Sequence, residues 1–162
     1  MSANKPICTA TEIARWFVNR VDRESGDIIS HLKLQKLVYY AQAWYLANFE
    51  KPLFDEEIEA WTHGPVVQSV WNEYKQYGWD AIPAGEEPNL ELRIKAILEL
   101  IFERYGDMGA KALENMTHRE EPWRKTRGNL PLEARCNRPI KKETMRDYYG
   151  KKIGKVYPPK NQ

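Results

Sequence analysis

Apolar side chains recur along most of this chain at intervals of three and four residues, the spacing of one face of an α-helix. On this pattern we predict helices over about 9–24, 30–49, 65–77, 89–105, 108–116 and 141–149. The fourth holds the clearest stripe, formed by Leu90, Ile94, Ile97, Leu98, Ile101 and Tyr105. The predicted fold is therefore mainly α, a compact single-domain bundle of about five to six helices.

Local signals mark the ends of several of these helices. Thr9 and Glu12 have the spacing of a capping box, in which a hydroxyl caps the helix and a carboxylate returns to the cap amide. Ser30 is a typical cap for the second helix, and Asn89 for the fourth. Pro65 fits the first turn of the third helix, where its missing N–H would have no partner in any case.

The second predicted helix carries apolar or aromatic residues on two faces. One stripe holds Leu34, Leu37, Val38, Ala41 and Tyr45. The neighbouring stripe holds Lys33, Lys36, Tyr40 and Trp44. Such a helix either lies at the centre of the fold or meets a partner through its second face, and the sequence leaves both open. After it, apolar and acidic residues alternate over Glu57–Trp61, which predicts a short β-strand or hairpin.

Composition and charge narrow the class of protein. The 162 residues are 42% hydrophobic and 30% charged, as in soluble globular chains, and no apolar run is long enough to cross a membrane. The N-terminus lacks the apolar core of a signal peptide, so we expect a cytoplasmic protein. Cys8 and Cys136 lie far apart in sequence and are expected to be free thiols.

The net charge of +2 is unevenly distributed. Residues 1–117 hold 12 Lys and Arg against 18 Asp and Glu, whereas residues 118–162 hold 13 against 5. This basic C-terminal segment would suit nucleic acid or an acidic protein surface. We favour the simpler interpretation that it docks on the acidic remainder of its own chain or stays solvated.

The sequence contains no motif of nucleotide, metal or nucleophile chemistry. His31, His63 and His118 show no HxH or HExxH spacing, and there is no CxxC, GxGxxG or GxxxxGK[ST] pattern. Cys8 precedes a helix, but a catalytic thiol also needs a base. We therefore expect neither an enzyme nor a cofactor, and we expect His63 and His118 to be turn residues with local hydrogen bonds.

Aromatic residues are the strongest signal, because 13 of the 19 lie between Trp16 and Trp79. Most must belong to the core, and the open question is the exposure of Tyr40, Trp44, Trp61 and Trp71. Exposed Trp and Tyr side chains anchor protein interfaces. Binders of single-stranded nucleic acid also use aromatics, but beside a basic groove, and here the basic residues cluster elsewhere in the sequence.

The stretch LKLQKLVYYAQAWYLA, at 32–47, resembles the signature of the Panacea domain of SocA-like antitoxins, a family that includes phage-associated proteins called GepA. Further segments fit it: Pro52-Leu53-Phe54, Glu57–Trp61, Gly64–Val67, Tyr74–Gly78, Thr117-His118 and Pro122-Trp123. The combined motif is long and specific. The resemblance covers about residues 9–150, leaving an N-terminal extension at 1–8 and a flexible tail at 151–162.

The resemblance implies an antitoxin of a type II-like toxin–antitoxin system, often carried by a prophage. It would neutralise by direct contact a cognate protein toxin encoded by the adjacent gene. Two alternatives stay open: a proteolytic adaptor that delivers the toxin to a protease, and a nucleic-acid-binding regulator that uses the basic segment. Nucleic acid is the less expected partner, and no membrane is expected. The extension and the basic segment are expected to make partner-specific contacts.

The motif positions supply the candidate partner-binding residues. They are Lys33, Lys36, Tyr40, Trp44, Trp61, His63, Gly64, Pro65, Trp71, His118, Pro122 and Trp123. Among them, Gly64 and Pro65 are expected to set the turn before the third helix. His118, Pro122 and Trp123 are expected to hold the C-terminal segment on the core.

Overall fold

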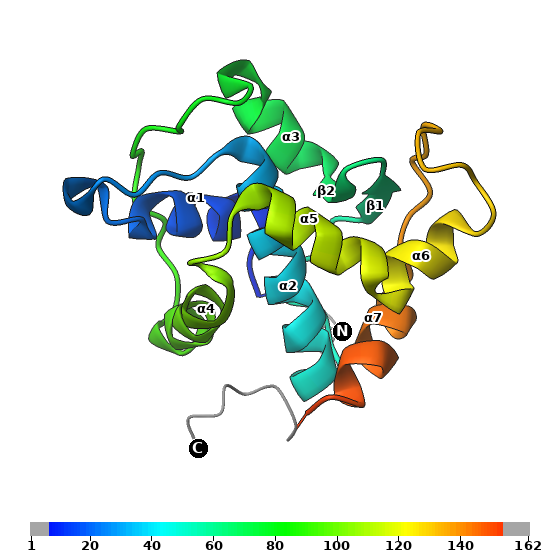
Figure 1. The fold of residues 1–162 in the computed structure, drawn as a ribbon. Coiled ribbons are helices and arrows are strands. Elements are labelled where there is room, and N and C mark those ends of the chain that lie inside the picture. Colours follow the sequence, from blue (N-terminus) through cyan, green and yellow to red (C-terminus); the bar gives the residue numbers. More distant parts are fainter. Residues whose placement is uncertain (1–6, 154–162) are drawn as a thin grey trace.

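One long helix, α2 (His31–Phe49), runs through the middle of the computed structural model, and the other elements surround it (Figure 1). The other helices are α1 (Ala10–Arg20), α3 (Gln68–Tyr74), α4 (Leu92–Tyr105), α5 (Ala110–Arg119), α6 (Glu121–Arg127) and α7 (Lys142–Gly150). Strands β1 (Ile58–Trp61) and β2 (Gly64–Val67) form a hairpin, and η2 (Arg23–Ser25) and η3 (Lys75–Tyr77) are 3-10 turns. The predicted mainly α, single-domain fold is confirmed.

The structure describes residues 7–153. Most of the expected N-terminal extension and C-terminal tail therefore lies outside the described residues. The end of the extension is held in place, because the backbone N–H groups of Ile7 and Cys8 both donate to the Leu53 carbonyl at 3.2 Å.

The predicted caps of the first two long helices are present. The Glu12 N–H donates to the Thr9 hydroxyl at 3.2 Å, and the Thr9 N–H donates to the Glu12 carboxylate at 2.9 Å, which completes the capping box. The Lys33 N–H donates to the Ser30 hydroxyl at 3.3 Å. Both signals are local in sequence, so neighbouring residues suffice to form them.

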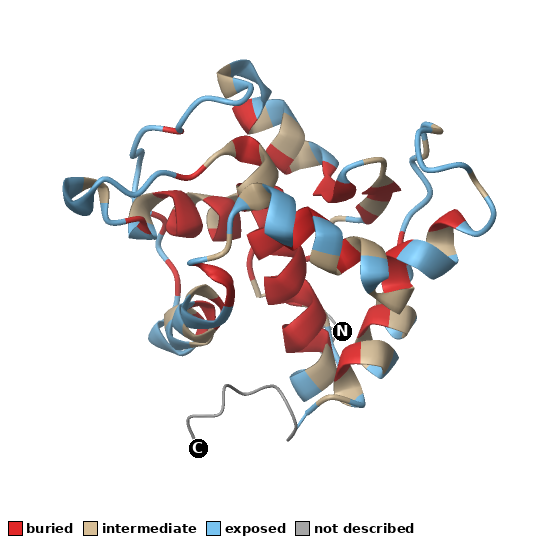
Figure 2. Cartoon of the chain, viewed as in Figure 1, coloured by how far each residue is buried: buried red, intermediate tan, exposed pale blue. Residues whose placement is uncertain are grey.

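Helix α2 is central to the fold, and 14 of its 19 residues are buried (Figure 2). Two of its buried glutamines bind backbone that would otherwise lack partners. Gln42 accepts from the Leu53 N–H and donates to the Phe54 carbonyl, both at 2.8 Å, and Gln35 accepts from the Val67 N–H at 2.9 Å. The two glutamines therefore fix the chain before β1 and the end of β2 on the helix. They also supply the hydrogen bonds that buried backbone groups need.

The hairpin corrects the prediction for Pro65. This residue lies in β2, opposite Ala60 of β1, and helix α3 begins only at Gln68. Pro65 could have begun a helix, but the pairing with β1 and the burial of all four residues of β2 decide its conformation. The other edge of β1 is also paired, because the Ala60 N–H donates to the Arg138 carbonyl at 2.9 Å.

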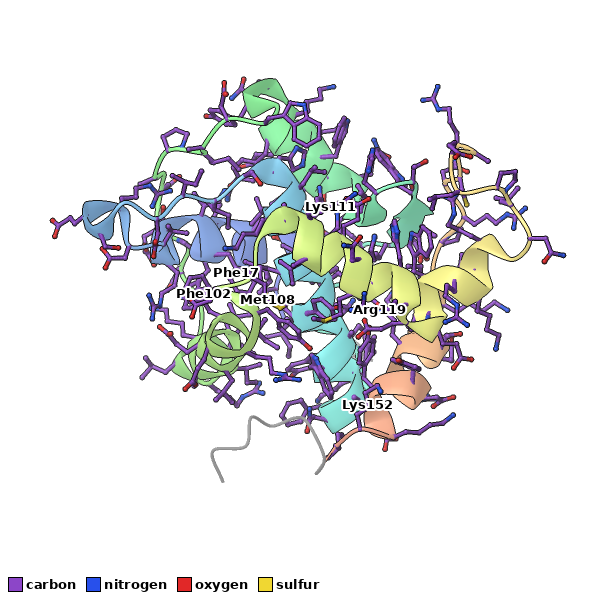
Figure 3. All side chains as sticks on the ribbon, viewed as in Figure 1. Phe17, Phe102, Met108, Lys111, Arg119 and Lys152 are labelled. Carbon is purple, nitrogen blue, oxygen red and sulfur yellow. The ribbon has the colours of Figure 1, made fainter. Side chains whose placement is uncertain are left out.

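Two further boundaries differ from the sequence pattern. Helix α4 begins after Glu91 rather than after Asn89. Helix α6 was not predicted, although Pro122 in its first turn is a recognised start signal. Helices α1 and α4 pack through the stacked rings of Phe17 and Phe102, whose centroids are 6.4 Å apart (Figure 3).

The basic C-terminal segment docks on the core through the packing of α7 on α2 and through Arg127, which binds backbone carbonyls. Arg127 is 2% exposed and donates to the carbonyls of Ala60, Pro131, Leu132 and Ala134 at 2.8–3.1 Å. Its guanidinium also lies 5.0 Å from the centre of the Trp123 ring. Lys142 lies 3.9 Å from Glu57, a contact with the acidic part of the chain. The segment is thus docked on the core, and apolar packing and carbonyls contribute to this more than ion pairs with the acidic part of the chain.

Candidate partner-binding groove

A groove with a volume of about 1030 Å³ is lined by residues of the hairpin, the start of α2, α3 and the loop that follows α6. Figure 1 shows where these elements lie. The lining residues of the groove are His31, Leu32, Glu59, Trp61, Thr62, His63, Val66, Gln68, Trp71, Lys75, Gly78, Trp79, Arg135, Cys136 and Asn137. We call it the aromatic groove. Its lining joins residues more than 100 positions apart in sequence, so only the folded chain forms it.

Three tryptophans give the aromatic groove its apolar surface. The rings of Trp61 and Trp71 lie 5.1 Å apart, and Trp71 also packs on His31 at 4.9 Å. The Trp61 indole N–H donates to the Glu59 carboxylate at 2.7 Å, which fixes the ring. Trp79 is 77% exposed. The groove therefore presents aromatic surface that is already ordered before any partner arrives.

A cluster of ionisable groups lies beneath the hairpin turn. Lys36 of α2 is fully buried, and its ammonium has no hydrogen-bond partner among the described residues. Burial lowers the pKa of Lys36 to about 8, while the charge of Glu114 acts in the opposite direction. Gly64 packs directly on this lysine, since a Cβ atom there would lie 2.6 Å from Lys36 Cε. We call Lys36, His63, Gly64, Glu114 and His118 the hairpin cluster.

Glu114 of α5 joins the two histidines of this cluster. Its carboxylate lies 3.0 Å from His63 Nδ1 and 3.9 Å from His118 Nε2. Burial alone would raise the pKa of Glu114, but the hydrogen bond from His63 and the neighbouring cations bring it below its ordinary value. His118 lies in α5, so the prediction that it is a turn residue is wrong. Burial lowers the pKa of its imidazole.

The aromatic groove and the hairpin cluster are physically connected. The His118 ring stacks on Trp123 at 3.9 Å, and the Trp123 indole N–H donates to the Trp61 carbonyl at 2.8 Å. Trp61 thus lines the groove with its ring and holds α6 with its backbone. The described residues bring together seven of the predicted positions: Lys36, Trp61, His63, Gly64, Trp71, His118 and Trp123.

Three other predicted positions lie away from the groove. Lys33 is half-buried and donates to the Gly106 carbonyl at 2.6 Å. Tyr40 and Trp44 are buried against α4, where Tyr40 stacks on Tyr105 at 4.1 Å and the Trp44 N–H donates to the Tyr105 hydroxyl at 2.8 Å. Tyr40, Trp44 and Lys36 are therefore buried within the fold, where they offer no surface to a partner in this structure. Their residue types suit an interface equally well, and only tertiary packing distinguishes the two.

The remaining two predicted positions are structural as well. Pro65 is part of the buried strand β2, and Pro122 is buried in the first turn of α6. Neither residue lines the aromatic groove.

Tyr40 and Trp44 belong to a second group farther along α2, made of buried aromatic residues around the half-buried Glu120. We call it the tyrosine cluster: Tyr39, Tyr40, Trp44, Tyr105, Glu120 and Tyr149. Glu120 accepts from the Tyr40 hydroxyl at 2.8 Å and from the Tyr149 hydroxyl at 2.6 Å. Burial raises the pKa of Glu120 despite these two bonds.

Sequence reasoning missed Lys75, Glu114 and the Arg135–Asn137 wall of the groove. Glu114 lies one helical turn before His118, which was a usable signal, but nothing local marks the other residues. Within residues 7–153, no group of three or more His, Cys, Asp and Glu side chains converges as a metal site would require. No helix in that range is long and apolar enough to cross a membrane.

The fold and the groove define a small, mainly α domain with a preformed aromatic surface. The chain belongs to the family described as antitoxin SocA-like, Panacea domain, whose profile matches residues 34–124. Comparison with curated proteins and with solved structures gave no match. The matched range contains the hairpin, α3, Glu114 and His118, whereas α1, α7 and the Arg135–Asn137 wall lie outside it.

Proposed function

We propose that this chain is the antitoxin of a toxin–antitoxin pair and that it neutralises a protein toxin by binding it in the aromatic groove. The observation that carries this proposal is the family match over residues 34–124, which includes the hairpin and most of α2. The geometry supports it, because a groove lined by Trp and Arg side chains has the residue types that dominate binding energy at interfaces.

The construction of the groove suits a common scaffold with a variable partner. The hairpin and α3 form one side and lie inside the family match, whereas Arg135–Asn137 form another side and lie outside it. A change in the latter residues would alter the groove without changing the hairpin. This division fits a family whose members are expected to meet different toxins.

In the proposed mechanism the chain acts by occupancy and not by chemistry. The toxin surface that engages the groove would be covered and unable to reach its target. Because the Trp61 ring is already held by Glu59 and the hairpin by α2, little conformational entropy would be lost on binding. We propose that the toxin is released from the complex chemically unchanged, which intact-mass measurement of the separated toxin would check.

The test is co-expression of the chain with the product of its neighbouring gene. Wild-type chain should restore growth that the neighbour abolishes, and the two proteins should elute together in size exclusion. Trp79→Ala should weaken both effects, because Trp79 lines the groove and is 77% exposed. Phe49→Ala is the matched control, since Phe49 is 45% exposed and ends α2 away from the groove. Absence of rescue and of a complex with wild-type chain would refute the proposal.

A further inference from the structure

We infer that the toxin segment that enters the aromatic groove is acidic and carries an aromatic or large apolar side chain. This inference rests on the function proposed above and specifies the chemistry of the partner. It is drawn from the charged and indole groups that line the groove and from their lack of partners within the chain.

The two cations of the groove are exposed and unpaired. Lys75 follows α3 and Arg135 lies in the loop after α6, and neither side chain has a hydrogen bond or ion pair with any described residue. Two other arginines, by contrast, are paired: Arg15 binds Glu73 at 3.1 Å and Arg20 binds Glu99 at 2.9 Å. Arg135 is therefore a bidentate donor that is free for a carboxylate of another molecule.

The lone carboxylate in the lining does not cancel these charges. Glu59 accepts the Trp61 indole N–H at 2.7 Å, so part of its acceptor capacity is used. The lining residues include two cations, Lys75 and Arg135, and one carboxylate, Glu59. With the histidines counted as neutral, the lining has a net positive charge. The groove thus complements a segment with more than one acidic residue.

The indole groups extend the same complementarity. The indole N–H groups of Trp71 and Trp79 have no hydrogen-bond partner within the described residues, so they can donate to carboxylate or carbonyl oxygens of a partner. Their ring faces, together with that of Trp61, accept an aromatic or apolar side chain. Acidic and aromatic residues in one segment would satisfy both kinds of group.

Single-stranded nucleic acid would also bring negative charge and stacking rings. The groove favours a peptide, because two cations and one carboxylate give a much weaker field than the continuous basic track that a phosphate backbone follows. Nucleic acid is therefore treated as an outcome of the test.

The decisive variant reverses both cations. Lys75→Glu/Arg135→Glu should weaken binding of the neighbouring gene's product on the order of 100-fold in titration calorimetry, by repulsion of acidic residues. Lys51→Glu/Lys151→Glu is the matched control, since it makes the same change in net charge at exposed positions near the ends of α2 and α7, away from the groove. The control should bind within about threefold of wild type.

A native cysteine reports on groove occupancy in the same samples. Cys136 lines the groove and is partly exposed, whereas Cys8 is buried and burial raises its pKa to about 12. N-ethylmaleimide should therefore modify Cys136 first, and bound toxin should slow that reaction at least tenfold. Peptide mass spectrometry identifies the modified residue.

The outcomes separate the inference from the proposed function. If toxin binds equally to wild type, to the charge-reversed groove variant and to the control, and leaves Cys136 reactive, the proposed antitoxin function stands. The inference that an acidic segment occupies the groove is then wrong. If wild-type chain neither binds nor rescues, both fail. If oligodeoxythymidylate protects Cys136 and competes with toxin in a salt-dependent way, the groove binds nucleic acid and the inference is overturned.

Discussion

The hairpin cluster and the tyrosine cluster both pack on α2, through Lys36 and Tyr40, which are about one helical turn apart, and they hold a glutamate in opposite ways. In the tyrosine cluster, Glu120 accepts two phenolic hydrogen bonds of 2.6 and 2.8 Å. In the hairpin cluster, Glu114 holds one histidine at 3.0 Å, while the ammonium of Lys36 lacks a hydrogen-bond partner among the described residues. In the tyrosine cluster the glutamate is hydrogen-bonded. The hairpin cluster borders the open aromatic groove and contains an ammonium group without a hydrogen-bond partner among the described residues.

This difference separates stability from function. Buried polar groups that are fully bonded hold elements together, here α2, α4 and α7. Buried polar groups without partners lower the stability of the fold, and buried ionisable groups with shifted pKa values are concentrated at functional sites. The comparison therefore predicts that changes in the tyrosine cluster mainly affect unfolding, whereas changes around the hairpin affect the groove as well.

The largest expected effect is that of Tyr149→Ala in the tyrosine cluster. Its ring is fully buried against Tyr39 and Trp44, so truncation should lower the free energy of unfolding by about 4 kcal/mol. Urea denaturation followed by circular dichroism measures this. Tyr148→Ala is the control on the same helix, because Tyr148 is only partly buried, and it should cost about 1 kcal/mol. Equal losses for both variants would contradict the structural role of the cluster.

Lys36→Met should have the opposite sign. Burial holds the pKa of Lys36 near 8 instead of 10.5, so its charge costs on the order of 3 kcal/mol at pH 7, and methionine of similar length removes that cost. The unfolded state binds more protons than the folded state between pH 8 and 10.5, so wild type gains stability over that range. The advantage of the variant should therefore shrink as pH rises. A variant less stable than wild type at pH 7 would show that the ammonium has a partner.

Gly64→Ala should destabilise the hairpin by about 2 kcal/mol. Gly64 has φ +113°, a conformation that residues with a side chain rarely adopt, and its Cβ atom would meet Lys36 Cε at 2.6 Å. Thermal unfolding measures the loss. Gly85→Ala is the control, since nothing lies within 4 Å of a Cβ atom there, and an equal loss in both variants would contradict the role of close packing at Gly64.

The predictable parts of the fold are those set by nearby residues. The capping box of Thr9 and Glu12 and the cap at Ser30 formed as expected, because each needs only a few consecutive residues. The prediction for Pro65 was wrong because the residue suits both a helix start and a strand. Pairing with Ala60 in the hairpin decides for the strand. Helix α6 was missed because seven residues give too little periodicity.

The candidate site was predictable only in part. Trp61, His63 and Trp71 were named from the motif and do line the groove. Lys36 was placed on a second stripe whose role, core or partner surface, the sequence left open. Its burial follows from contact with β2, which periodicity does not reveal. Arg135 and Cys136 carry no local signal, since the pairing of residues 138–140 with β1 brings them to the groove.

The smallest effect is a difference in how stability varies with pH. The folded-state pKa of Glu120 lies above 4.5, so the folded chain binds the proton more tightly than the unfolded chain, and stability falls as pH rises above 4.5. The pKa of Glu114 is lowered, so its contribution is present above 4.5 and is lost as pH falls below it. Urea titrations of Glu120→Gln and Glu114→Gln between pH 3.5 and 6 should each remove one of these trends. Identical pH profiles for the two variants would mean that the clusters do not differ in the way their glutamates are held.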